Sequence, residues 1–357
     1  ADARDARLAA TLAGNGVALR RSAGRLLGDP DAVLGKSGAP YKVFTPYLKA
    51  AMPGWRLRER PPPERLACVP LPEALRSFAA TIAPPRPAWD RGFWDAWSPG
   101  EVAARERLQE FLDRLDDYPE ARDLPAVDGT SRLSPHLHFG EIGPGRVLAA
   151  ARERGGAGAD KFAAELGWRE FAYYVLHHWP RSIRENFNPR FDAMGWREDA
   201  AGLEAWKRGR TGVPLVDAGM RQLWHQGWMH NRVRMVAASW LTKHMGMHWT
   251  HGADWFLHTL VDADLANNAL GWQWVAGTGV DAAPYFRVFN PVTQSRRFDP
   301  DGDYIRRWVP ELRALDAKAI HAPWESGVVP RSYPPRPMVD PAKGRAEALA
   351  RLADTMR

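Results

Sequence analysis

The densest group of side chains able to do chemistry lies at residues 260–274, which read LVDADLANNALGWQW. Asp262 and Asp264 place two carboxylates in one short stretch, and carboxylate oxygens are ligands that divalent cations prefer. No histidine or third acid follows at ligand spacing, so a divalent metal site is the poorer interpretation. The two acids can instead accept hydrogen bonds from N–H or ribose hydroxyl groups, or pair with Arg234.

Other metal sites find little support in the sequence. Cys68 is the only cysteine, which excludes an internal disulfide and a cluster of cysteine ligands. His248, His251 and His258 lie close together in sequence, but their spacing is not that of an HExxH zinc motif. We therefore expect no metal.

Three further segments carry polar side chains in suggestive patterns. Residues 128–135 (DGTSRLSP) place hydroxyl groups beside a glycine, which suits phosphate oxygens, although a simple capping turn gives the same pattern. In a helix, Glu165, Trp168 and Arg169 share one face, as a surface ion pair beside a core tryptophan also would. Residues 231–235 place an amide, a guanidinium and a methionine within one turn, and could line a polar pocket for a planar ligand.

Tryptophan is unusually frequent, with 17 residues in 357 and seven of them between residues 224 and 274. Each indole is large, rigid and apolar, and has one N–H group to satisfy. Core packing explains some of these residues, but it does not readily explain their concentration in one segment.

Helical periodicity predicts the elements that must position these groups. Apolar residues recur at helical spacing, whereas the alternation typical of strands is scarce, so the fold class is mainly α. Ser98 and Glu101 form the pattern of a helix-capping box. The predicted helices cover residues 1–20, 41–52, 98–116, 143–154, 158–179, 202–208, 214–227, 228–245, 251–260, 303–315 and 342–354.

Proline and glycine suggest how the chain is divided. Residues 53–100 are rich in proline and poor in periodicity, as expected of a connector that lies on a surface. We predict three parts: residues 1–94 as the end of an N-terminal domain and a connector, residues 95–320 as a helical domain, and residues 321–357 as a tail and a last helix. The chain starts without methionine in the middle of a pattern, which reads as a fragment or a trimmed chain.

The composition is that of a soluble globular protein, with 45% hydrophobic and 25% charged residues. No apolar run is long enough for a transmembrane helix, and no signal peptide is visible. The net charge of +7 suits a polyanionic partner, although an arginine-rich, GC-biased genome would produce the same excess.

Several ordered motifs resemble the photolyase/cryptochrome family. The resemblance spans essentially the whole chain and implies a helical FAD-binding domain, with the family's N-terminal α/β antenna domain largely absent. The motifs are YKVFTPY (41–47), GTSRLSPHLHFGEI (129–142), ELGWREF (165–171), GVPLVDAGMRQLWHQGWMHNRVRM (212–235), LVDADLANNALGWQWVAGTGVDAAPYFRVFNP (260–291) and FDPDGDYIRRWVPEL (298–312).

By this resemblance, FAD is held in a U shape, active in its reduced form FADH⁻. Asp262 is expected to pair with Arg234 beside the flavin ring, and Phe162 stands where relatives often have tryptophan. The implied FAD-binding residues are Tyr118, Thr130, Ser131, Leu133, Ser134, Phe162, Arg169, Asn231, Arg234, Asp262, Asp264 and Asn268. The resemblance also implies an antenna chromophore of the folate or deazaflavin type. Which of the two it is cannot be read from this sequence, because the antenna domain is largely absent.

The resemblance also implies an electron-hopping chain and a lesion-binding wall. Trp272 would lie nearest the flavin, Trp249 between, and Trp196 nearest solvent. Glu165 would hydrogen-bond the lesion's thymine edge, and Asn268 would lie near the flavin N5 atom. The implied contacts to UV-damaged DNA are Glu165, Trp168, Asn231, Arg232, Met235 and Trp274, with Arg287 and Gln294 at the backbone.

The implied activity is light-driven repair of cyclobutane pyrimidine dimers (CPDs) by electron transfer from excited FADH⁻. Relatives that repair (6-4) photoproducts have histidine where this chain has Asn231 and Met235, and plant-type cryptochromes usually have aspartate in place of Asn268. Cryptochromes and single-strand-specific relatives tend to have tyrosine in place of Trp274. These positions favour a CPD photolyase, of the bacterial class I type, acting as a cytoplasmic monomer. The alternatives are a signalling cryptochrome without repair activity and a DNA-binding helical module without a cofactor.

Overall fold

The computed structural model describes residues 2–20, 25–55, 65, 72–73, 75, 88–282 and 286–357. Within these ranges the chain is helical, and the pairing of Arg197 with Met247 is an isolated β-bridge outside any strand. The predicted mainly α class is therefore confirmed. Cys68 and most of the predicted connector at 53–100 lie outside the described residues. Every helix in the described ranges is too short or too polar to span a bilayer.

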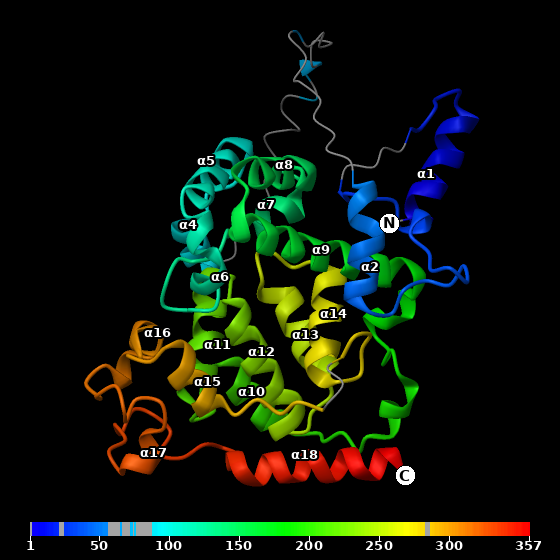
Figure 1. Cartoon of the computed structure of the whole chain (residues 1–357). Coiled ribbons are helices and arrows are strands. Elements are labelled where there is room, and N and C mark those ends of the chain that lie inside the picture. Colours follow the sequence, from blue (N-terminus) through cyan, green and yellow to red (C-terminus); the bar gives the residue numbers. More distant parts are fainter. Residues whose placement is uncertain are drawn as a thin grey trace.

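Most helices pack into one body, with α13 and α14 side by side near its centre and α18 along one end, whereas α1 stands at its edge (Figure 1). The α-helices are α1 Asp2–Gly14, α2 Phe44–Ala51, α4 Arg91–Ala96, α5 Glu101–Leu112, α6 Tyr118–Ala121, α7 Ser134–Phe139, α8 Pro144–Arg154, α9 Gly156–His178, α10 Ala200–Lys207, α11 Pro214–Gln226, α12 Asn231–Ser239, α13 Trp249–Thr259, α14 Leu265–Ala276, α15 Pro291–Phe298, α16 Asp303–Trp308, α17 Pro323–Ser326 and α18 Pro341–Met356. Short 3-10 helices are η1 Pro30–Ala32, η2 Met52–Gly54, η3 Ala88–Asp90, η4 Leu115–Asp117, η5 Pro180–Ile183, η6 Pro189–Ala193 and η8 Pro310–Leu312, and η7 Trp240–His244 is a π-helix.

Sequence periodicity located several helices well, including α2, α8, α9, α10, α11, α13 and α18. It missed α14 and α15. Helix α14 packs against α9, α12 and α13, so its apolar residues do not form a single stripe that periodicity can detect. The predicted helix 303–315 ends early, because α16 stops at Trp308 before Pro310. The predicted capping box is also wrong, since α5 begins after Gly100 without a side-chain cap.

The predicted helix 228–245 is interrupted at both ends. Helix α12 begins only at Asn231, because the His230 ring accepts the Arg232 backbone N–H at 3.2 Å and caps the helix there. Its last turn widens into η7, whose Lys243 side chain donates to the Ala276 carbonyl oxygen at 2.6 Å. A π-turn shifts the following side chains relative to a regular helix, which periodicity cannot anticipate.

Buried side chains form two hydrophobic cores. The first joins α10 to α14 with α16 and includes Trp249 and Trp272. The second joins α5 to α9 with residues 27–55. The segment expected to belong to the N-terminal part and connector therefore contributes Phe44 and Tyr47 to the core around α9.

Residues 25–41 are held on α9 by buried polar contacts. The Glu170 carboxylate accepts the Leu27 backbone N–H at 2.7 Å and lies 2.8 Å from the Arg169 guanidinium. Further along the helix, the Tyr174 hydroxyl donates to the Val33 carbonyl oxygen at 2.7 Å. This segment thus contacts the same helix that carries Glu165, Trp168 and Arg169.

Glu170 should make stability depend on pH. Burial raises its pKa to about 7, although Arg169 and the Leu27 and Gly28 N–H groups oppose the shift. Because the folded pKa lies above the unfolded one, folding takes up a proton between them. The contribution of Glu170 to the free energy of unfolding is greatest in acid. It falls as the pH rises toward 7, by at most about 1.4 kcal/mol per pH unit.

We expect Glu170→Gln to reduce the pH dependence of the unfolding free energy between about pH 4.5 and 7. Urea denaturation at several pH values measures this slope. Glu101→Gln, at a residue whose side chain is 71% exposed, is the matched control and should leave the slope unchanged. An unaltered slope in the Glu170 variant would refute the assignment.

Candidate functional site

A cavity of about 600 Å³ lies between the two hydrophobic cores. Helices α6, α7 and α9 form one wall, and α12, α13 and α14 form the other. Cofactor sites typically have volumes of about 300–1,000 Å³ and combine apolar walls with a few polar groups. The lining residues are Tyr118, Arg122, Asp123, Ser131, Ser134, Leu137, His138, Lys161, Phe162, Glu165, Leu166, Trp168, Arg169, Asn231, Arg232, Arg234, Met235, Ala238, Phe256, Leu260, Asp262, Asp264, Asn267, Asn268, Leu270, Gly271, Trp272, Trp274 and Val275.

Most residues singled out from the sequence meet in this cavity. The ones that line it are Tyr118, Ser131, Ser134, Phe162, Glu165, Trp168, Arg169, Asn231, Arg232, Arg234, Met235, Asp262, Asp264, Asn268, Trp272 and Trp274. The ones outside its lining are Thr130, Leu133, Trp196, Trp249, Arg287 and Gln294. Four segments far apart in sequence therefore contribute to one site, as expected if they serve one ligand.

Two of the predicted FAD contacts, Thr130 and Leu133, lie outside the cavity lining. The Leu133 side chain is fully buried in the core around α9, and the Thr130 carbonyl oxygen accepts from Arg107 Nη2 at 3.0 Å. Both stand in the turn before α7, where the neighbouring Ser131 and Ser134 do line the cavity. The buried Leu133 side chain therefore cannot contact FAD in the cavity, and the predicted role of Leu133 cannot depend on its side chain.

The turn that carries these serines is fixed by its surroundings. A Cβ at Gly129 would lie 2.3 Å from the Ala121 carbonyl oxygen, so only glycine fits there. Arg132 adopts a positive φ of 52°, and its guanidinium lies over the rings of Trp97 and Trp228 at 5.4 and 5.0 Å. The packing thus holds the turn in a strained form that presents Ser131 to the cavity.

Arg234 and Asp262 form an ion pair in the wall, as expected from the sequence. The Arg234 Nη2 atom lies 2.9 Å from Asp262 Oδ2, and Nε donates to the Met229 carbonyl oxygen at 2.7 Å. The Asp262 side chain is only 5% exposed, so its charge depends on this partner. The pair joins α12 to the loop before α14.

Asp264 anchors the start of α14. It caps the helix by accepting the Asn267 backbone N–H at 2.8 Å, and it also accepts from the Tyr173 hydroxyl of α9. Burial alone would raise its pKa, but hydrogen bonds from His138, Tyr173 and Asn267 outweigh burial and lower the pKa to about 2. The carboxylate is therefore an ionised acceptor at neutral pH.

Asn268, one turn into α14, is oriented by its neighbour. Its Nδ2 atom donates to the Ala253 carbonyl oxygen of α13 at 2.9 Å. This bond uses one of the two N–H groups of the amide, so the second N–H and the amide oxygen are left for a ligand in the cavity.

Two arginines of the lining, Arg169 and Arg232, each have a buried guanidinium donor without a hydrogen-bond partner among the described residues. Among the described residues, Arg169 Nη2 is buried and has no hydrogen-bond partner, whereas Nη1 donates to the Arg25 carbonyl oxygen at 2.9 Å. A buried donor without a partner costs about 1–3 kcal/mol, so a ligand acceptor there would stabilise the protein. As a residue of the lining, Arg169 provides a positive charge near the hydroxyl groups of Ser131 and Ser134, a combination that suits the diphosphate of FAD.

Glu165 lies in a more basic setting than the sequence suggested. Its carboxylate pairs with Arg122 Nη2 at 2.9 Å and with Lys161 Nζ at 3.4 Å. Neither partner was singled out from the sequence: Lys161 is one helical turn before Glu165 and could have been, whereas Arg122 lies on another helix. Arg232 is likewise paired across the cavity mouth, 2.6 Å from Asp123.

Two indoles belong to this part of the cavity. The Trp168 ring is stacked on Phe44 of α2, with centroids 3.7 Å apart and planes within 10°. The contact fixes the plane of Trp168 and ties residues 44–51 to the site. Trp274 lines the opposite wall on α14.

The three tryptophans of the expected electron-hopping chain are graded in burial. Trp272 lines the cavity and is 3% exposed, Trp249 is fully buried, and Trp196 is half-buried. The His248 ring lies between the outer two, 5.0 Å from Trp196 and 5.5 Å from Trp249. From the sequence, His248 was considered only as a zinc ligand, and its place beside these two tryptophans was not expected.

The inner end of the series is tightly packed. A Cβ at Gly252 would lie 2.0 Å from the Trp272 ring, so glycine is required where α13 meets this indole. Phe256 contacts the same ring edge-on, with centroids 5.0 Å apart. Trp272 is therefore held in one orientation at the cavity wall.

The two predicted DNA-backbone contacts lie apart from the cavity lining. Arg287 is exposed, and its guanidinium lies 5.9 Å from the Phe289 ring centroid. Gln294 is half-buried on α15, and among the described residues its Oε1 atom has no hydrogen-bond partner. Their roles stay predictions.

Two family models match the chain. The model for the FAD binding domain of DNA photolyase matches residues 162–354, and the DNA photolyase model matches residues 1–67. The first covers α9 from Phe162 onward and the whole wall formed by α12, α13 and α14. The second covers the segment packed on α9.

Known proteins resemble the chain along nearly its whole length. A deoxyribodipyrimidine photo-lyase from Agrobacterium fabrum is 45% identical, in an alignment that covers 98% of this chain and 76% of the relative. The crystal structure of a bacterial class III photolyase from Agrobacterium tumefaciens is 44% identical with a TM-score of 0.91, over 99% of this chain and 77% of that one. A Synechocystis cryptochrome structure is 30% identical with a TM-score of 0.82, over 97% and 75% of the two chains.

Proposed function

Because the chain belongs to the DNA photolyase family, we propose that it repairs cyclobutane pyrimidine dimers in damaged DNA with light and FAD. The observation that carries the proposal is the cavity. Its volume is that of a cofactor site, and its lining includes the Arg234–Asp262 pair, Arg169 and Trp272. Reduced FAD bound there would supply light-driven one-electron chemistry: the electron given to the dimer returns once the cyclobutane ring has opened, so repair involves no net redox change.

The chain's own residues hold the cofactor by charge and by shape. Arg169 and the serines of the turn before α7 would bind its phosphates, and Asp264, an ionised acceptor, would accept from its hydroxyl or N–H groups. Asn268 would present its amide oxygen or its second amide N–H to the flavin ring. The apolar rings of Phe162 and Phe256 exclude water from the remaining wall.

The lesion would enter between Trp168 and Trp274. Extruding a base pair step costs a few kcal/mol, less for a distorted dimer, and stacking on an aromatic ring returns about 1–3 kcal/mol per base. Glu165, oriented by Arg122, would accept from the thymine N–H at the same end of the cavity. Trp272, Trp249 and Trp196 would carry an electron inward from solvent to reduce oxidised flavin.

The residues of the site indicate the substrate of the enzyme more clearly than they indicate its photolyase class. Asn231, Met235, Asn268 and Trp274 differ from the residues typical of (6-4) photolyases, plant-type cryptochromes or single-strand-specific relatives, and so favour CPD repair. These four residues do not separate the classes of CPD photolyase. The similarity to a class III photolyase structure favours a class III-like enzyme over the class I type expected from the sequence. A cytoplasmic monomer stays a prediction.

The second candidate is a flavin photoreceptor without repair activity, favoured by the similarity to the Synechocystis cryptochrome. The discriminating experiment gives pre-reduced, FAD-loaded protein irradiated duplex DNA and counts dimers after illumination. Dimer loss that requires light supports the repair enzyme. A flavin that responds to light while the dimers persist supports the photoreceptor.

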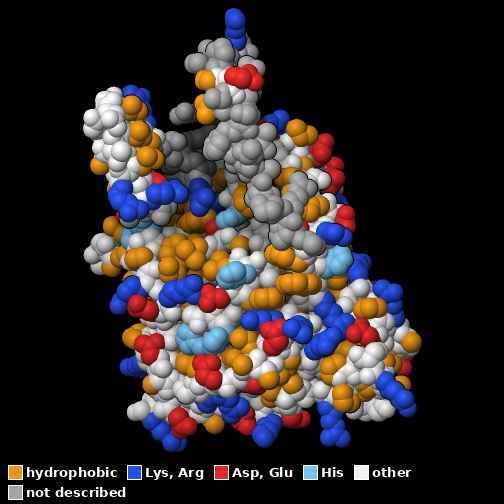
Figure 2. Space-filling model, turned by 180° about the vertical axis from the view of Figure 1, so that it is seen from behind, with side chains coloured by type: hydrophobic (Ala, Val, Ile, Leu, Met, Phe, Trp, Pro, Cys, Tyr) orange, Lys and Arg blue, Asp and Glu red, His pale blue; other side chains and the backbone are white. Residues whose placement is uncertain are grey.

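DNA binding should be strongly salt-dependent. On the face seen in Figure 2, basic, acidic and apolar side chains are interspersed, whereas Arg122, Lys161 and Arg232 gather at the cavity. Each phosphate contact releases counterions, so log affinity should fall by about 0.9 per contact per log unit of salt.

We expect Lys161→Ala to lower this salt slope by about one contact, measured by fluorescence anisotropy with a dimer-containing duplex. Arg181→Ala is the control, since that side chain is 84% exposed and outside the cavity lining. A salt-independent affinity, or equal slopes for wild type and the Lys161 variant, would contradict this binding surface.

A further inference from the structure

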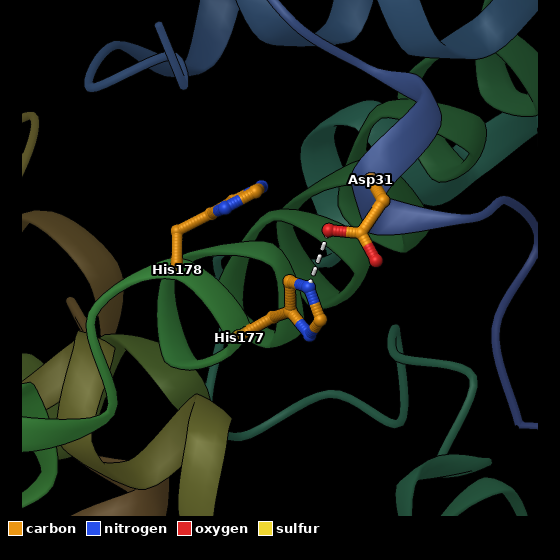
Figure 3. Close-up of side chains that lie close together, drawn as sticks. All are labelled: Asp31, His177 and His178. Atoms are coloured by element: carbon orange, nitrogen blue, oxygen red, sulfur yellow. Dashed lines mark hydrogen bonds and ion pairs between the residues drawn. The ribbon is translucent and has the colours of Figure 1, made fainter.

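Three potential metal ligands meet where residues 25–41 cross the end of α9. Asp31 lies in η1, and His177 and His178 are the last two residues of α9. One ligand atom from each lies within 4.8 Å of the other two. His177 and Asp31 come from segments 146 residues apart, yet their side chains point at each other (Figure 3).

The contacts within this group already orient the ligands. His177 Nε2 lies 2.7 Å from Asp31 Oδ1, and the Asp31 backbone N–H is bonded to Asp29 Oδ1 at 3.0 Å. His178 Nε2 lies 3.3 Å from the Pro30 carbonyl oxygen, which adds an oxygen donor beside the group. The His178 ring packs edge-on against Tyr174, with centroids 4.5 Å apart, so its position is restricted.

The location favours a cation. The last carbonyl groups of a helix carry a partial negative charge, and α9, with 23 residues, ends at these histidines. Two imidazoles with one carboxylate suit zinc and its neighbours in the first transition row, whereas calcium and magnesium prefer sites made of oxygen alone.

We propose that Asp31, His177 and His178 bind a divalent transition-metal ion of the zinc type. Water and the Pro30 carbonyl oxygen complete the coordination. The ion clamps residues 25–41 to the helix that carries Glu165, Trp168 and Arg169, and so stabilises one wall of the cavity from outside. The site is separate from the cavity, so it stands whether or not the proposed repair activity is correct.

Isothermal titration of Zn²⁺ into the FAD-loaded full chain, freed of metal and of any histidine tag, tests the proposal. One saturable site is expected. His177→Ala should weaken it at least tenfold, since loss of even an outer partner of a metal ligand costs on the order of 10- to 100-fold. Asp31→Asn, at a side chain that is 69% exposed, should weaken it similarly and leaves folding intact even if the histidine variant does not fold.

His258→Ala is the matched control. His258 is also an exposed histidine in the last turn of a helix, with Nδ1 bonded to the Asp254 carbonyl oxygen at 2.6 Å. Unchanged Zn²⁺ binding in this variant, with loss in the other two, supports the site. The proposal would be overturned by absence of saturable Zn²⁺ binding to wild type, by wild-type affinity in the Asp31 and His177 variants, or by Ca²⁺ binding as tightly as Zn²⁺.

Discussion

Replacing Trp272 by phenylalanine should abolish photoreduction of oxidised FAD while repair by pre-reduced protein continues. The indole lines the cavity on one side and contacts Phe256 and Gly252 of α13 on the other. A phenyl ring fits the same packed space but is far harder to oxidise than indole. An electron from solvent would therefore stop at the end of the chain formed by Trp196 and Trp249.

The measurement is the loss of oxidised-flavin absorbance under blue light with an external reductant. Trp240→Phe is the matched control, because Trp240 is equally buried and, among the described residues, its Nε1 atom has no partner. Photoreduction at the wild-type rate in Trp272→Phe would refute the assigned chain. Loss of repair by the pre-reduced variant would instead place Trp272 in the repair step.

Replacing Arg234 by methionine should remove FAD from the purified protein. The substitution keeps the apolar stem but leaves the Asp262 carboxylate, 5% exposed, without its cation. Breaking a buried ion pair from one side costs about 3–5 kcal/mol, and here the unpaired charge faces the cofactor cavity. Flavin content per protein and urea denaturation report the two effects.

Arg221→Met is the control for this prediction. Arg221 contacts Glu311 at 2.7 Å outside the cavity, and both side chains are 22% exposed, so water can solvate the remaining charge. The Arg221→Met variant should therefore be only modestly less stable than wild type and should retain FAD. The double variant Arg234→Met with Asp262→Asn should recover part of the stability without restoring flavin. Full flavin content in Arg234→Met would show that the pair does not hold the cofactor.

Part of the helical scaffold follows from local pattern, because a helix such as α8 buries a single apolar stripe. Helix α14 escaped that reasoning although it carries Trp272 and Trp274, since several of its faces are buried. The motif order nevertheless identified its residues. Family resemblance thus supplied what periodicity could not.

The site was predictable to the extent that its residues occur in motifs. The Arg234–Asp262 pair was expected and is present. The partners of Glu165 were not, because Arg122 reaches it only through the packing of α6 against α9. The cluster of Asp31 with His177 and His178 depends on a contact across 146 residues, and no local pattern encodes such a contact.

Light-dependent removal of dimers is the most direct test of the proposed repair activity. The FAD-loaded chain, fully reduced, is mixed with a duplex containing one cyclobutane dimer and, in parallel, with a duplex containing one (6-4) photoproduct. Illuminated samples should lose the cyclobutane dimer over many turnovers, while dark samples and the (6-4) duplex remain unchanged. Persistence of the cyclobutane dimer under light, with flavin bound and reduced, would contradict the account.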